Sequence, residues 1–531
     1  MAVETGAGRA NGLIEALLRP ETYPDPTSSV ELRETHISWV FLTDRFAYKL
    51  KKPVRFEFVD FSTPEARYRA CQAELRLNRR WTRGVYLDVV PVLRSPDGDI
   101  YVGTGPGRPI DWMVHMRRLP DSLRLDQRIL QRTLTEAERD RLVRTLATLY
   151  RDLPPLAVEA DEYRRRVEAH VRGNWEELRH AVGDLSELAV RRSQSQQWRW
   201  VRLFGTTLAD RARDGRIVDG HGDLRPDHIY LEEPLAIVDC VEFRDDFRRL
   251  DALDDLVFLV MECRVLEEQQ LGKQLIDAYR RAAEDHFDHR LYWFYLAYRA
   301  SVRAKVLWLK ARQKHGILDR PTLQRAATYL ALADEAADNL LPPLLIVLRG
   351  VSGSGKSTLG NALVEELALE RLSTDEVRQA MFGPSAHVHA WQAGRYQPEY
   401  RQQVYDMLFS RAEELLSDRL SVLVDGTFLE EALCERAEQV ARQHGAQVLF
   451  VECQCDLETL RERLKARTPG QDAGSEADWQ IARRQLELLQ PISSLPQTIV
   501  DTRASFPEQI ESVKASLRRI LKPPAPGALP R

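Results

Sequence analysis

Apolar and polar positions divide the chain into three stretches with different periods. The first stretch alternates at a period of about two, which is typical of strands with one buried face. Strands are expected at His36–Leu42, Phe46–Lys51, Tyr86–Leu93 and Asp111–Met116. From Glu136 to Leu332 the apolar spacing is mostly helical, with one strand-rich patch at Ile229–Phe243. These two stretches predict a small sheet lobe followed by a helical lobe.

One helix of the sheet lobe begins at a recognisable signal. Ser62, Thr63 and Glu65 form a capping-box pattern around Pro64 in the first turn. Small and apolar residues then recur at helical spacing, and Glu74 borders the face that they form. A helix is therefore expected to follow Thr63 and to carry Glu74 at the edge of its apolar face.

The third stretch alternates apolar strands with amphipathic helices. It begins after the segment Leu340–Pro343, whose two prolines end the helical region. Strands are expected at Leu344–Leu348, Leu369–Ser373, Ser421–Val424, Val448–Val451 and Thr498–Val500. This alternation predicts an α/β domain with a five-stranded parallel sheet that has helices on both faces. The proline-rich tail at 522–531 is predicted to be disordered.

Composition limits the class of protein. At 531 residues the chain is long enough for about three domains of roughly 150 residues each. Its 44% hydrophobic and 29% charged residues are ordinary for a water-soluble protein, and no stretch reaches the ~20 apolar residues of a membrane helix. The N-terminus lacks the apolar core of a secretory signal, and six cysteines are too few for a disulfide scaffold. We therefore expect a cytoplasmic protein without a membrane segment.

The segment Gly350–Ser357 fits the Walker A phosphate-binding pattern, and it stands between a predicted strand and a predicted helix. Its glycines let backbone N–H groups turn towards a phosphate, Lys356 neutralises the terminal phosphates, and Ser357 offers a hydroxyl ligand to Mg²⁺. The predicted nucleotide-binding residues are Gly350, Gly353, Ser354, Gly355, Lys356, Ser357 and Thr358. The alternative is a glycine-rich turn without a ligand. The segment predicts binding of ATP or GTP with Mg²⁺.

Charged residues after the neighbouring strands are candidates for metal binding and catalysis. Asp425 ends a strand and is predicted to join the magnesium site, although a turn aspartate would fit too. Asp375 is a candidate general base for an acceptor hydroxyl and Arg378 a candidate for holding an anionic group, with a helix N-cap and a solvated side chain as the alternatives. Arg463 and Arg467 are either lid arginines over the transferring phosphate or ordinary surface charge.

With these residues, the segment 344–515 resembles the small P-loop kinases, which include the polynucleotide kinase, zeta-toxin, chloramphenicol phosphotransferase and gluconate kinase groups. The spacing between Asp375 and Arg378 resembles the acceptor motif of the polynucleotide kinase branch. The resemblance implies that Asp375 is the general base.

A second set of acids lies in the strand-rich patch of the helical stretch. The segment His221–His228 contains Asp223 and precedes a strand, and the next strand ends at Asp239. Phosphoryl transfer needs one carboxylate to orient the attacking hydroxyl and another to hold magnesium, and Asp223 and Asp239 suit these respective roles. The alternative is that His221 and Asp223 only stabilise a turn.

This segment is similar to the Brenner-type loop of aminoglycoside phosphotransferases, whose fold is that of protein kinases. The resemblance implies that Lys49, on a predicted strand, grips the nucleotide phosphates, and that Glu74 is its ion-pair partner. Lys51 lies on the same strand face and is a rival for the role of Lys49. Asp254 and Asp255 resemble the acidic motif that follows the metal-binding aspartate in this family.

Two features depart from the pattern of that family. His228 stands where these kinases carry the asparagine that binds a second metal, and histidine is a poor magnesium ligand. His228 is retained as a candidate metal ligand. In addition, the tight turn Thr43–Arg45 replaces a glycine-rich loop between the first two strands. Both features leave a degenerate N-terminal site as an alternative to an active one.

The order of the parts resembles the bacterial bifunctional aminoglycoside phosphotransferase and ATP-binding proteins over almost the whole chain. This resemblance implies an α+β protein-kinase-like bilobal domain, with an N-lobe at 1–120 and a helical C-lobe at 121–340, and an α/β P-loop kinase domain at 341–521.

The sequence therefore predicts an ATP-dependent phosphotransferase with two candidate nucleotide sites, each acting on a hydroxyl of a small-molecule, sugar or nucleotide-like acceptor. The alternatives are a single working P-loop kinase with an N-terminal pseudokinase domain, or an ATP-dependent regulatory switch. The net charge of −4 gives no bulk attraction to nucleic acid, so nucleic acid is not favoured as a partner.

Overall fold

The computed structural model describes residues 12–56, 59–312, 318–383, 398–466, 479–492 and 494–522. The chain divides into two compact units, one formed by residues 1–159 and 211–286 and the other by residues 160–210 and 287–531. The domain boundaries expected after residues 120, 340 and 521 stay predictions. The predicted disordered tail lies, from residue 523 onward, outside the described residues.

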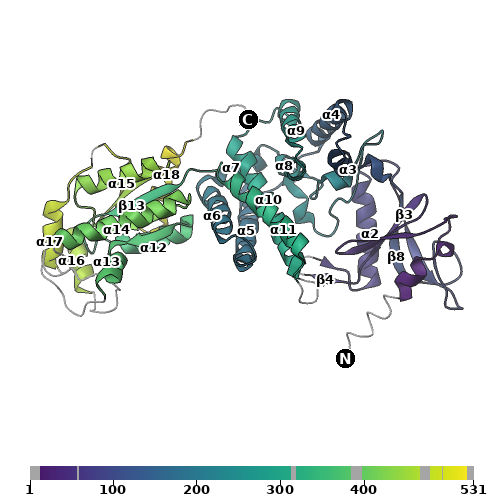
Figure 1. Ribbon diagram of the computed structural model, residues 1–531, viewed down its shortest axis with the longest axis horizontal. Coiled ribbons are helices and arrows are strands. Elements are labelled where there is room, and N and C mark those ends of the chain that lie inside the picture. Colours follow the sequence, from purple (N-terminus) through teal and green to yellow (C-terminus); the bar gives the residue numbers. More distant parts are fainter. Residues whose placement is uncertain are drawn as a thin grey trace. The chain divides into compact units, whose positions relative to one another are not determined.

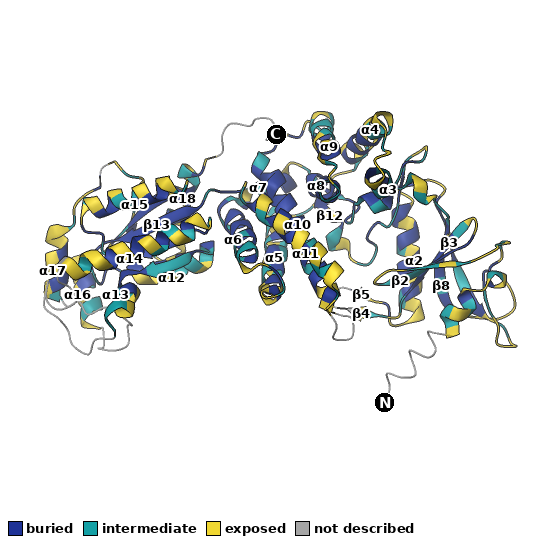
Figure 2. Ribbon diagram, viewed as in Figure 1, coloured by how far each residue is buried: buried dark blue, intermediate teal, exposed yellow. Residues whose placement is uncertain are grey.

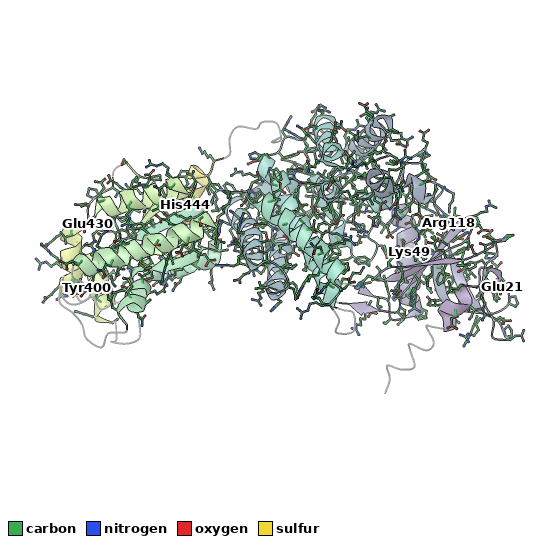
Figure 3. All side chains as sticks on the ribbon, in the orientation of Figure 1. Glu21, Lys49, Arg118, Tyr400, Glu430 and His444 are labelled. Atoms are coloured by element: carbon green, nitrogen blue, oxygen red, sulfur yellow. The ribbon has the colours of Figure 1, made fainter. Side chains whose placement is uncertain are left out.

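The first unit contains a six-stranded antiparallel sheet with the strand order β1-β2-β3-β8-β6-β7. Its strands β3 and β8 are labelled in Figure 1. Its strands are β1 (Glu31–Glu34), β2 (Ser38–Leu42), β3 (Phe46–Lys51), β6 (Tyr86–Arg94), β7 (Ile100–Val102) and β8 (Arg108–Arg117). The pattern of apolar and polar residues thus yields strands at all four expected places, although burial does not alternate strictly and β3 is buried at five of its six positions. Lys49, labelled in Figure 3, lies on β3 opposite Val114 of β8.

Helix α2 (Pro64–Asn78) packs against β6 and β8 of this sheet. Thr63 is its N-cap, with a side-chain oxygen that accepts a hydrogen bond from the backbone N–H of Ala66. Cys71 and Leu75 join the buried apolar cluster under the sheet, which brings the neighbouring Glu74 into the interior. The sheet and α2 therefore place Lys49 and Glu74 on facing elements.

The rest of the first unit is mostly helical and carries short hairpins. Its helices are α3 (Leu125–Leu130), α4 (Glu136–Asp152), α8 (Ala252–Val265) and α9 (Gln269–Ala282), and α7 (Thr206–Arg213) spans its junction with the second unit. Its short strand pairs are β4 (Arg55–Phe56) with β5 (Val59–Asp60), β9 (Ile217–Asp219) with β12 (Arg249–Asp251), and β10 (Ile229–Tyr230) with β11 (Ala236–Ile237). The segment His221–His228 follows β9, and Asp239 follows β11.

The second unit contains a five-stranded sheet, which confirms the predicted parallel sheet. Its order is β14-β15-β13-β16-β17, and every neighbouring pair is parallel. The strands are β13 (Leu344–Arg349), β14 (Glu370–Ser373), β15 (Val422–Asp425), β16 (Gln447–Gln454) and β17 (Gln497–Asp501). The central strand β13 is buried along its whole length (Figure 2), as expected for a parallel strand covered on both faces.

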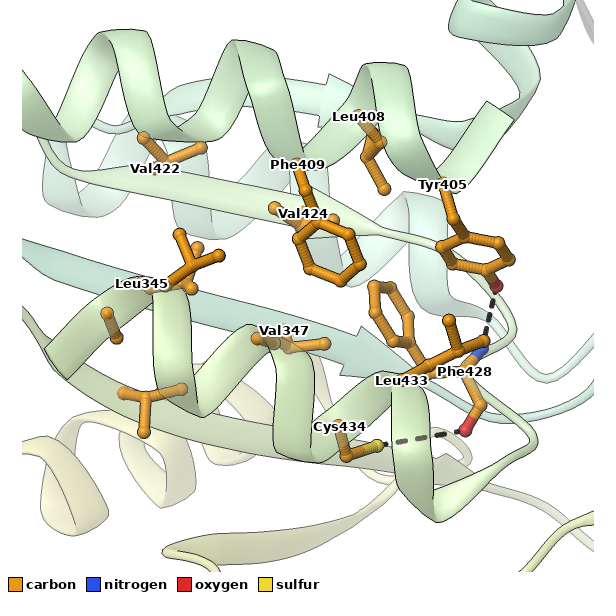
Figure 4. Close-up of a cluster of buried hydrophobic side chains, with 14 of the residues drawn as sticks. Leu345, Val347, Tyr405, Leu408, Phe409, Val422, Val424, Phe428, Leu433 and Cys434 are labelled. Atoms are coloured by element: carbon orange, nitrogen blue, oxygen red, sulfur yellow. Dashed lines mark hydrogen bonds between the residues drawn. The ribbon is translucent and has the colours of Figure 1, made fainter. Parts of the chain in front are cut away.

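Helices cover both faces of this sheet (Figure 1). On one face, Leu345 and Val347 of β13 form a buried cluster with α14 (Pro398–Ser417) and α15 (Glu431–Gln443), shown in Figure 4. On the other face lie α12 (Lys356–Leu367) and α18 (Phe506–Ile520). The unit also contains α13 (Thr374–Phe382), α16 (Leu457–Lys465), α17 (Trp479–Leu488) and the packed helices α5 (Ala160–Leu178), α6 (Glu187–Phe204), α10 (His289–Arg312) and α11 (Arg320–Ala337).

Helix α6 holds the C-terminal end of α12. The buried Arg199 guanidinium donates to the carbonyl oxygens of Leu367 and Ala368, at 3.0 and 2.9 Å. These carbonyls would otherwise lack partners at the helix end. Arg202 and Lys514 both pair with Glu366 on the last turn of α12, at 2.7 and 2.8 Å. Helix α12 is therefore fixed between its own sheet and a helix from far earlier in the sequence.

Replacing Arg199 by methionine is expected to lower the free energy of unfolding by roughly 2–4 kcal/mol, because two buried carbonyl oxygens lose their donor. The matched control is Arg191→Met on the same helix, whose side chain is 40% exposed and pairs with Glu370. That variant should lose less than about 1 kcal/mol. Urea denaturation of the whole chain, followed by tryptophan fluorescence, measures both. Equal losses in the two variants would contradict a special role for Arg199.

Candidate active sites

The carboxyl ends of three neighbouring strands bring the predicted C-terminal site together. In the parallel register, Asp425 at the end of β15 lies opposite Leu348 of β13 on one side and Ser373 of β14 on the other. The loop that begins at Gly350 follows β13 directly, and its first N–H donates to the carbonyl oxygen of Thr427, at 3.1 Å. Ligands of open parallel sheets bind at this edge.

The loop Gly350–Gly355 has the backbone form that a phosphate site requires. Gly350 and Gly355 have φ values of 130° and 92°, in the left-handed region that glycine adopts without strain. A Cβ atom on Gly350 would come within 2.7 Å of the carbonyl oxygen of Cys453, and one on Gly355 within 3.2 Å of Nη1 of Arg463. Both glycines are thus required by the surrounding structure as well as by the backbone.

The side chains of the loop fit a bound phosphate. Lys356, the first residue of α12, donates through Nζ to the carbonyl oxygen of Val351 at 2.7 Å, and so reaches across the loop. The buried Ser354 hydroxyl has no hydrogen-bond partner among the described residues. Ser357 and Thr358 are exposed on the first turn of α12, where a helix N-terminus favours anions. A phosphate would satisfy the orphaned Ser354 hydroxyl, and the N-terminus of α12 would favour its negative charge.

Two residues that the sequence analysis did not single out also hold this loop. The Gln485 side chain of α17 accepts a hydrogen bond from the backbone N–H of Ser352 at 2.7 Å. Thr502, just after β17, donates through Oγ1 to the carbonyl oxygen of Ser354 at 2.8 Å. Both residues lie more than a hundred positions from the loop, and no local pattern marks them. Only the fold brings them there.

Asp425 is buried at the strand end, where Arg371 donates to its Oδ2 from 3.2 Å. A carboxylate in this position suits a hard divalent cation such as magnesium, which takes oxygen ligands from few protein groups and several from phosphate and water. In the described part of the chain, no group of three or more His, Cys, Asp or Glu side chains forms a cation site by itself. Asp425 and Ser357 therefore suit a cation that arrives with a phosphate. Arg371 is a further residue that the sequence analysis missed.

Asp375 and Arg378 face each other on the first turns of α13. Arg378 donates to Oδ1 of Asp375, while the N-cap of the helix is Ser373, whose hydroxyl accepts from the N–H of Asp375. The Asp375 carboxylate is thus not used for capping. Burial raises the pKa of Asp375, and the charge of Arg378 opposes that rise. The charge of Lys356 acts on this pKa too, which places Asp375 in the electrostatic range of the phosphate loop.

Arg463 lies beside the phosphate loop on α16. Its guanidinium donates to both oxygens of Thr502, the side-chain Oγ1 and the carbonyl, at 2.9 Å each. Since Thr502 also bonds to Ser354, the arginine is linked to the loop through one residue. Arg467, the second predicted lid arginine, lies outside the described residues. The proposed lid role of both arginines stays a prediction.

The N-terminal candidate site contains a buried cluster of alternating charges. Lys49 pairs with Glu74 at 2.9 Å and with Asp239, while Lys51 pairs with the other oxygen of Glu74 and with Glu242. Glu74 has no exposed surface. Burial alone would raise its pKa, but the charges of Lys49 and Lys51 outweigh burial, and the pKa of Glu74 is lowered. Glu242 was not anticipated from the sequence.

Asp239 is held in an unusual backbone conformation at the mouth of this cluster. Its φ of 66° lies in the left-handed region, which a non-glycine residue adopts rarely and often at functional sites. Its N–H donates to the hydroxyl of Tyr86 at 3.1 Å, and 37% of its side-chain surface stays exposed. The nearby positive charge of Lys49 lowers the pKa of Asp239 against the opposing effect of burial.

The segment after β9 is anchored by Asp255 on α8. The Asp255 carboxylate accepts hydrogen bonds from the N–H of His221 at 2.6 Å, the N–H of Gly222 at 3.1 Å and the hydroxyl of Tyr150 at 2.7 Å. Burial lowers the pKa of His221 to about 4, so this imidazole is neutral at neutral pH. The anchor fixes the backbone just before Asp223.

His228 stands between the two carboxylates of this site. Its Nδ1 lies 3.7 Å from Oδ2 of Asp223, and its Nε2 lies 3.7 Å from Oδ2 of Asp239. Nε2 faces the guanidinium of Arg225 at 2.8 Å, which only donates, so the ring proton belongs on Nδ1, 2.9 Å from the carbonyl oxygen of Asp223. In this arrangement both ring nitrogens are engaged. The predicted metal-binding role of His228 would require Arg225 to move.

A protein-family model matches one part of the chain, and curated proteins match most of it. The family model described as an AAA domain matches residues 345–492. Two proteins named as uncharacterized, Rv2004c of Mycobacterium tuberculosis strain H37Rv and Mb2027c of Mycobacterium bovis, are each 31% identical over 476 residues. Each match covers 86% of this chain and 90% of the relative. Within the described ranges, no helix combines the length and apolar character that a bilayer crossing needs.

Solved structures resemble one part of the chain. A sugar kinase from a Janibacter species is 20% identical, with a TM-score of 0.26, over 34% of this chain and 97% of that chain. A gluconokinase from Sinorhizobium meliloti is 23% identical, with a TM-score of 0.25, over 34% and 94%. The APS kinase CysC of Mycobacterium tuberculosis is 20% identical, with a TM-score of 0.25, over 34% and 99%. Likenesses with TM-scores this low carry no functional weight.

Replacing Glu74 by glutamine is expected to lower the free energy of unfolding by roughly 3 kcal/mol or more at neutral pH, because two buried lysines lose a shared carboxylate. The control Glu65→Gln changes the same charge at an exposed position of the same helix. Because folding lowers the pKa of Glu74, its contribution is present above the unfolded value of 4.5 and disappears as the pH falls further. Denaturation series at pH 7 and pH 4 measure this. A loss that is the same for both variants, or independent of pH, would contradict the charge cluster.

Proposed function

This chain belongs to the family of the Mycobacterium tuberculosis protein Rv2004c, and we propose that it is an ATP-dependent phosphotransferase whose working centre is the phosphate loop Gly350–Ser357. The observation that carries the proposal is the strand register that sets Asp425 beside Leu348 and Ser373. Through it, a phosphate loop, a candidate metal carboxylate and a candidate general base meet at one sheet edge. The transferred group is the terminal phosphoryl of the nucleotide, and the acceptor is a hydroxyl of a small molecule.

Binding of the nucleotide is assigned to the loop itself. The N-terminus of α12 attracts the phosphates, and Lys356 leaves the carbonyl of Val351 to pair with them. Ser357 and Asp425 would hold magnesium, which neutralises charge on the phosphates when bound. Arg463 lies next to Gly355 and is suited to stabilise charge on the transferring group, with Arg467 as its predicted companion.

Acceptance of the hydroxyl proton is assigned to Asp375. A general base works best when its pKa lies near the working pH, and burial raises the pKa of this carboxyl towards that range. Arg378 keeps the carboxylate oriented and holds the pKa from rising further. The pair can thus bind an acceptor through the arginine while the carboxylate takes the proton.

We propose that the N-terminal cluster is a second phosphotransferase site of the aminoglycoside phosphotransferase type. Lys49 with Glu74 would hold the nucleotide phosphates, Asp223 would orient the acceptor hydroxyl, and Asp239 would hold magnesium with His228 beside it. The pairing of Lys49 with both Glu74 and Asp239 favours this assignment. The position of Arg225 on His228 favours the alternative, in which this site is a pseudokinase that binds a ligand or regulates the P-loop centre.

Lys356→Ala is expected to weaken Mg-ATP binding by at least about tenfold, because the lysine charge that we assign to the terminal phosphates is removed. Asp375→Asn should leave binding intact and lower turnover by roughly a hundredfold or more. Calorimetry and a coupled ADP assay measure these quantities, with Lys465→Ala and Asp418→Asn as exposed controls. Unchanged Mg-ATP binding in Lys356→Ala would contradict the proposal that the phosphate loop is the nucleotide site.

Arg378→Gln should move the acid limb of the pH–rate profile to higher pH, since Arg378 lowers the pKa of Asp375.

The second site is tested by screening ATP consumption against an acceptor library with Asp223→Asn and Asp375→Asn. Two working sites predict that each variant loses different acceptors, because each carboxylate serves its own hydroxyl. The exposed Asp97→Asn serves as the control in the first unit. If every acceptor depends on Asp375 and none on Asp223, the N-terminal site is a pseudokinase. If the parent phosphorylates no acceptor, the regulatory switch is favoured over both.

A further inference from the structure

A cavity of about 350 Å³ opens in the first unit, lined by residues distinct from those of the candidate nucleotide site. Its walls come from the C-terminal half of α2, the segment after α4, the end of β9 and the start of β12. The volume is within the range of small-molecule sites, and at ~30 Å³ per water it has room for about ten waters. The cavity is therefore larger than an inorganic ion needs.

The lining carries more positive than negative charge. Four arginines and two aspartates face the cavity, which leaves a surplus of two positive charges (4 − 2). Asp219 is shared by Arg80 and Arg248, at 2.7 and 2.9 Å. Asp245 pairs with Arg248 at 2.7 Å. The hydrogen bond from this arginine is the main reason why the pKa of Asp245 is lowered. Both acids are thus already paired with arginines of the lining, and the surplus of positive charge remains after both are counted.

Arg248 lies at the base of the cavity, where its hydrogen bonds hold the side chain in place. Its side chain is only 5% exposed, and each of its three nitrogens donates to a partner: Nε to Asp219, Nη2 to Asp245 and Nη1 to the carbonyl oxygen of Val241, the last at 2.8 Å. The outer arginines differ from it. Arg76 lies exposed on α2, one helical turn before Arg80, and Arg249 keeps 52% of its side chain exposed while its Nη2 lies 3.9 Å from Asp245. A rigid cation at the base and flexible cations at the rim suit an anion that enters from solvent.

Two leucines add an apolar wall. Leu77 is buried on α2, and Leu156 is half-buried on the opposite segment, where its N–H donates to the carbonyl oxygen of Ile217 at 2.8 Å. A bare phosphate or sulfate has no use for such a wall, whereas the carbon skeleton of an organic molecule does. We propose that this cavity binds a phosphate monoester of a small organic molecule, with the phosphate on the rim arginines and the carbon skeleton on the leucines.

A ligand in this cavity would connect two elements that carry the N-terminal charge cluster, namely α2 and the segment after Asp239. Helix α2 bears Glu74, and it already contacts the segment after Asp239 through Asn78, whose side-chain oxygen accepts from the N–H of Cys240 at 3.0 Å. Arg248 holds the carbonyl of the next residue, Val241. A phosphate held by Arg76 of α2 and by Arg249, the neighbour of Arg248, would add a second, indirect link between the helix and this segment. Binding itself does not depend on either proposed phosphotransferase site.

The test is calorimetry on the full chain with ribose 5-phosphate, glucose 6-phosphate, glycerol 3-phosphate, the free sugars and inorganic phosphate. At least one monoester is expected to bind, its free sugar to bind at least tenfold more weakly, and inorganic phosphate to bind more weakly than the monoester. Arg76→Gln should weaken binding of the monoester at least tenfold, because it removes one of the rim charges that hold the phosphate. Since Arg76 is exposed, this replacement is expected to leave the fold intact. Arg80→Gln should act in the same direction.

Arg69→Gln is the matched control, since it removes the same charge from an exposed position of the same helix outside the cavity. It should leave monoester binding unchanged. Binding lost equally in Arg69→Gln and Arg76→Gln would overturn the proposal, because a general charge effect would then explain it. Failure of all three monoesters to bind would also overturn it. Equal affinities for inorganic phosphate and the monoesters would refute the role of the leucine wall.

Discussion

The register of the parallel sheet in the second unit is the constraint on which its candidate chemistry depends. Asp425 lies opposite both Leu348 and Ser373, so three strands end at one level. Each strand is followed directly by a segment with a chemical group: the phosphate loop after β13, the Asp375–Arg378 pair after β14, and Asp425 itself at the end of β15. A shift of β15 by one residue would reverse the faces of its side chains and turn Asp425 away from that edge.

The two candidate sites differ in the partners of their lysine side chains. In the second unit, Lys356 donates to the carbonyl oxygen of Val351, and the buried Ser354 hydroxyl is unsatisfied within the described residues. In the first unit, Lys49 and Lys51 are already balanced by Glu74, Asp239 and Glu242. At the phosphate loop, an incoming polyphosphate would have to replace only the carbonyl partner of Lys356, and it would meet the unsatisfied Ser354 hydroxyl. At the other it would have to replace an existing carboxylate partner of lysine.

The sequence predicted the elements well because their signals are local. The alternation of strands and helices after Leu344 located all five parallel strands, and the Walker A pattern located the loop between β13 and α12. Thr63 as the start of α2 was visible as well. Thr502, Gln485 and Glu242 were not predicted, because each acts through a contact with a residue distant in sequence and none belongs to a local pattern. The same reason explains the contact of Arg199 with α12.

The division of the chain has a consequence for how the protein is made. The backbone passes from one compact unit to the other after residues 159, 210 and 286, so each unit is assembled from separated pieces. During synthesis, the helices at 160–210 emerge from the ribosome well before α12, the helix that Arg199 holds at its C-terminal end. These helices must therefore wait until α12, which ends at Leu367 of 531 residues, has been translated, and that is about seven-tenths of the chain. A chaperone or a provisional packing arrangement would shield them in that interval.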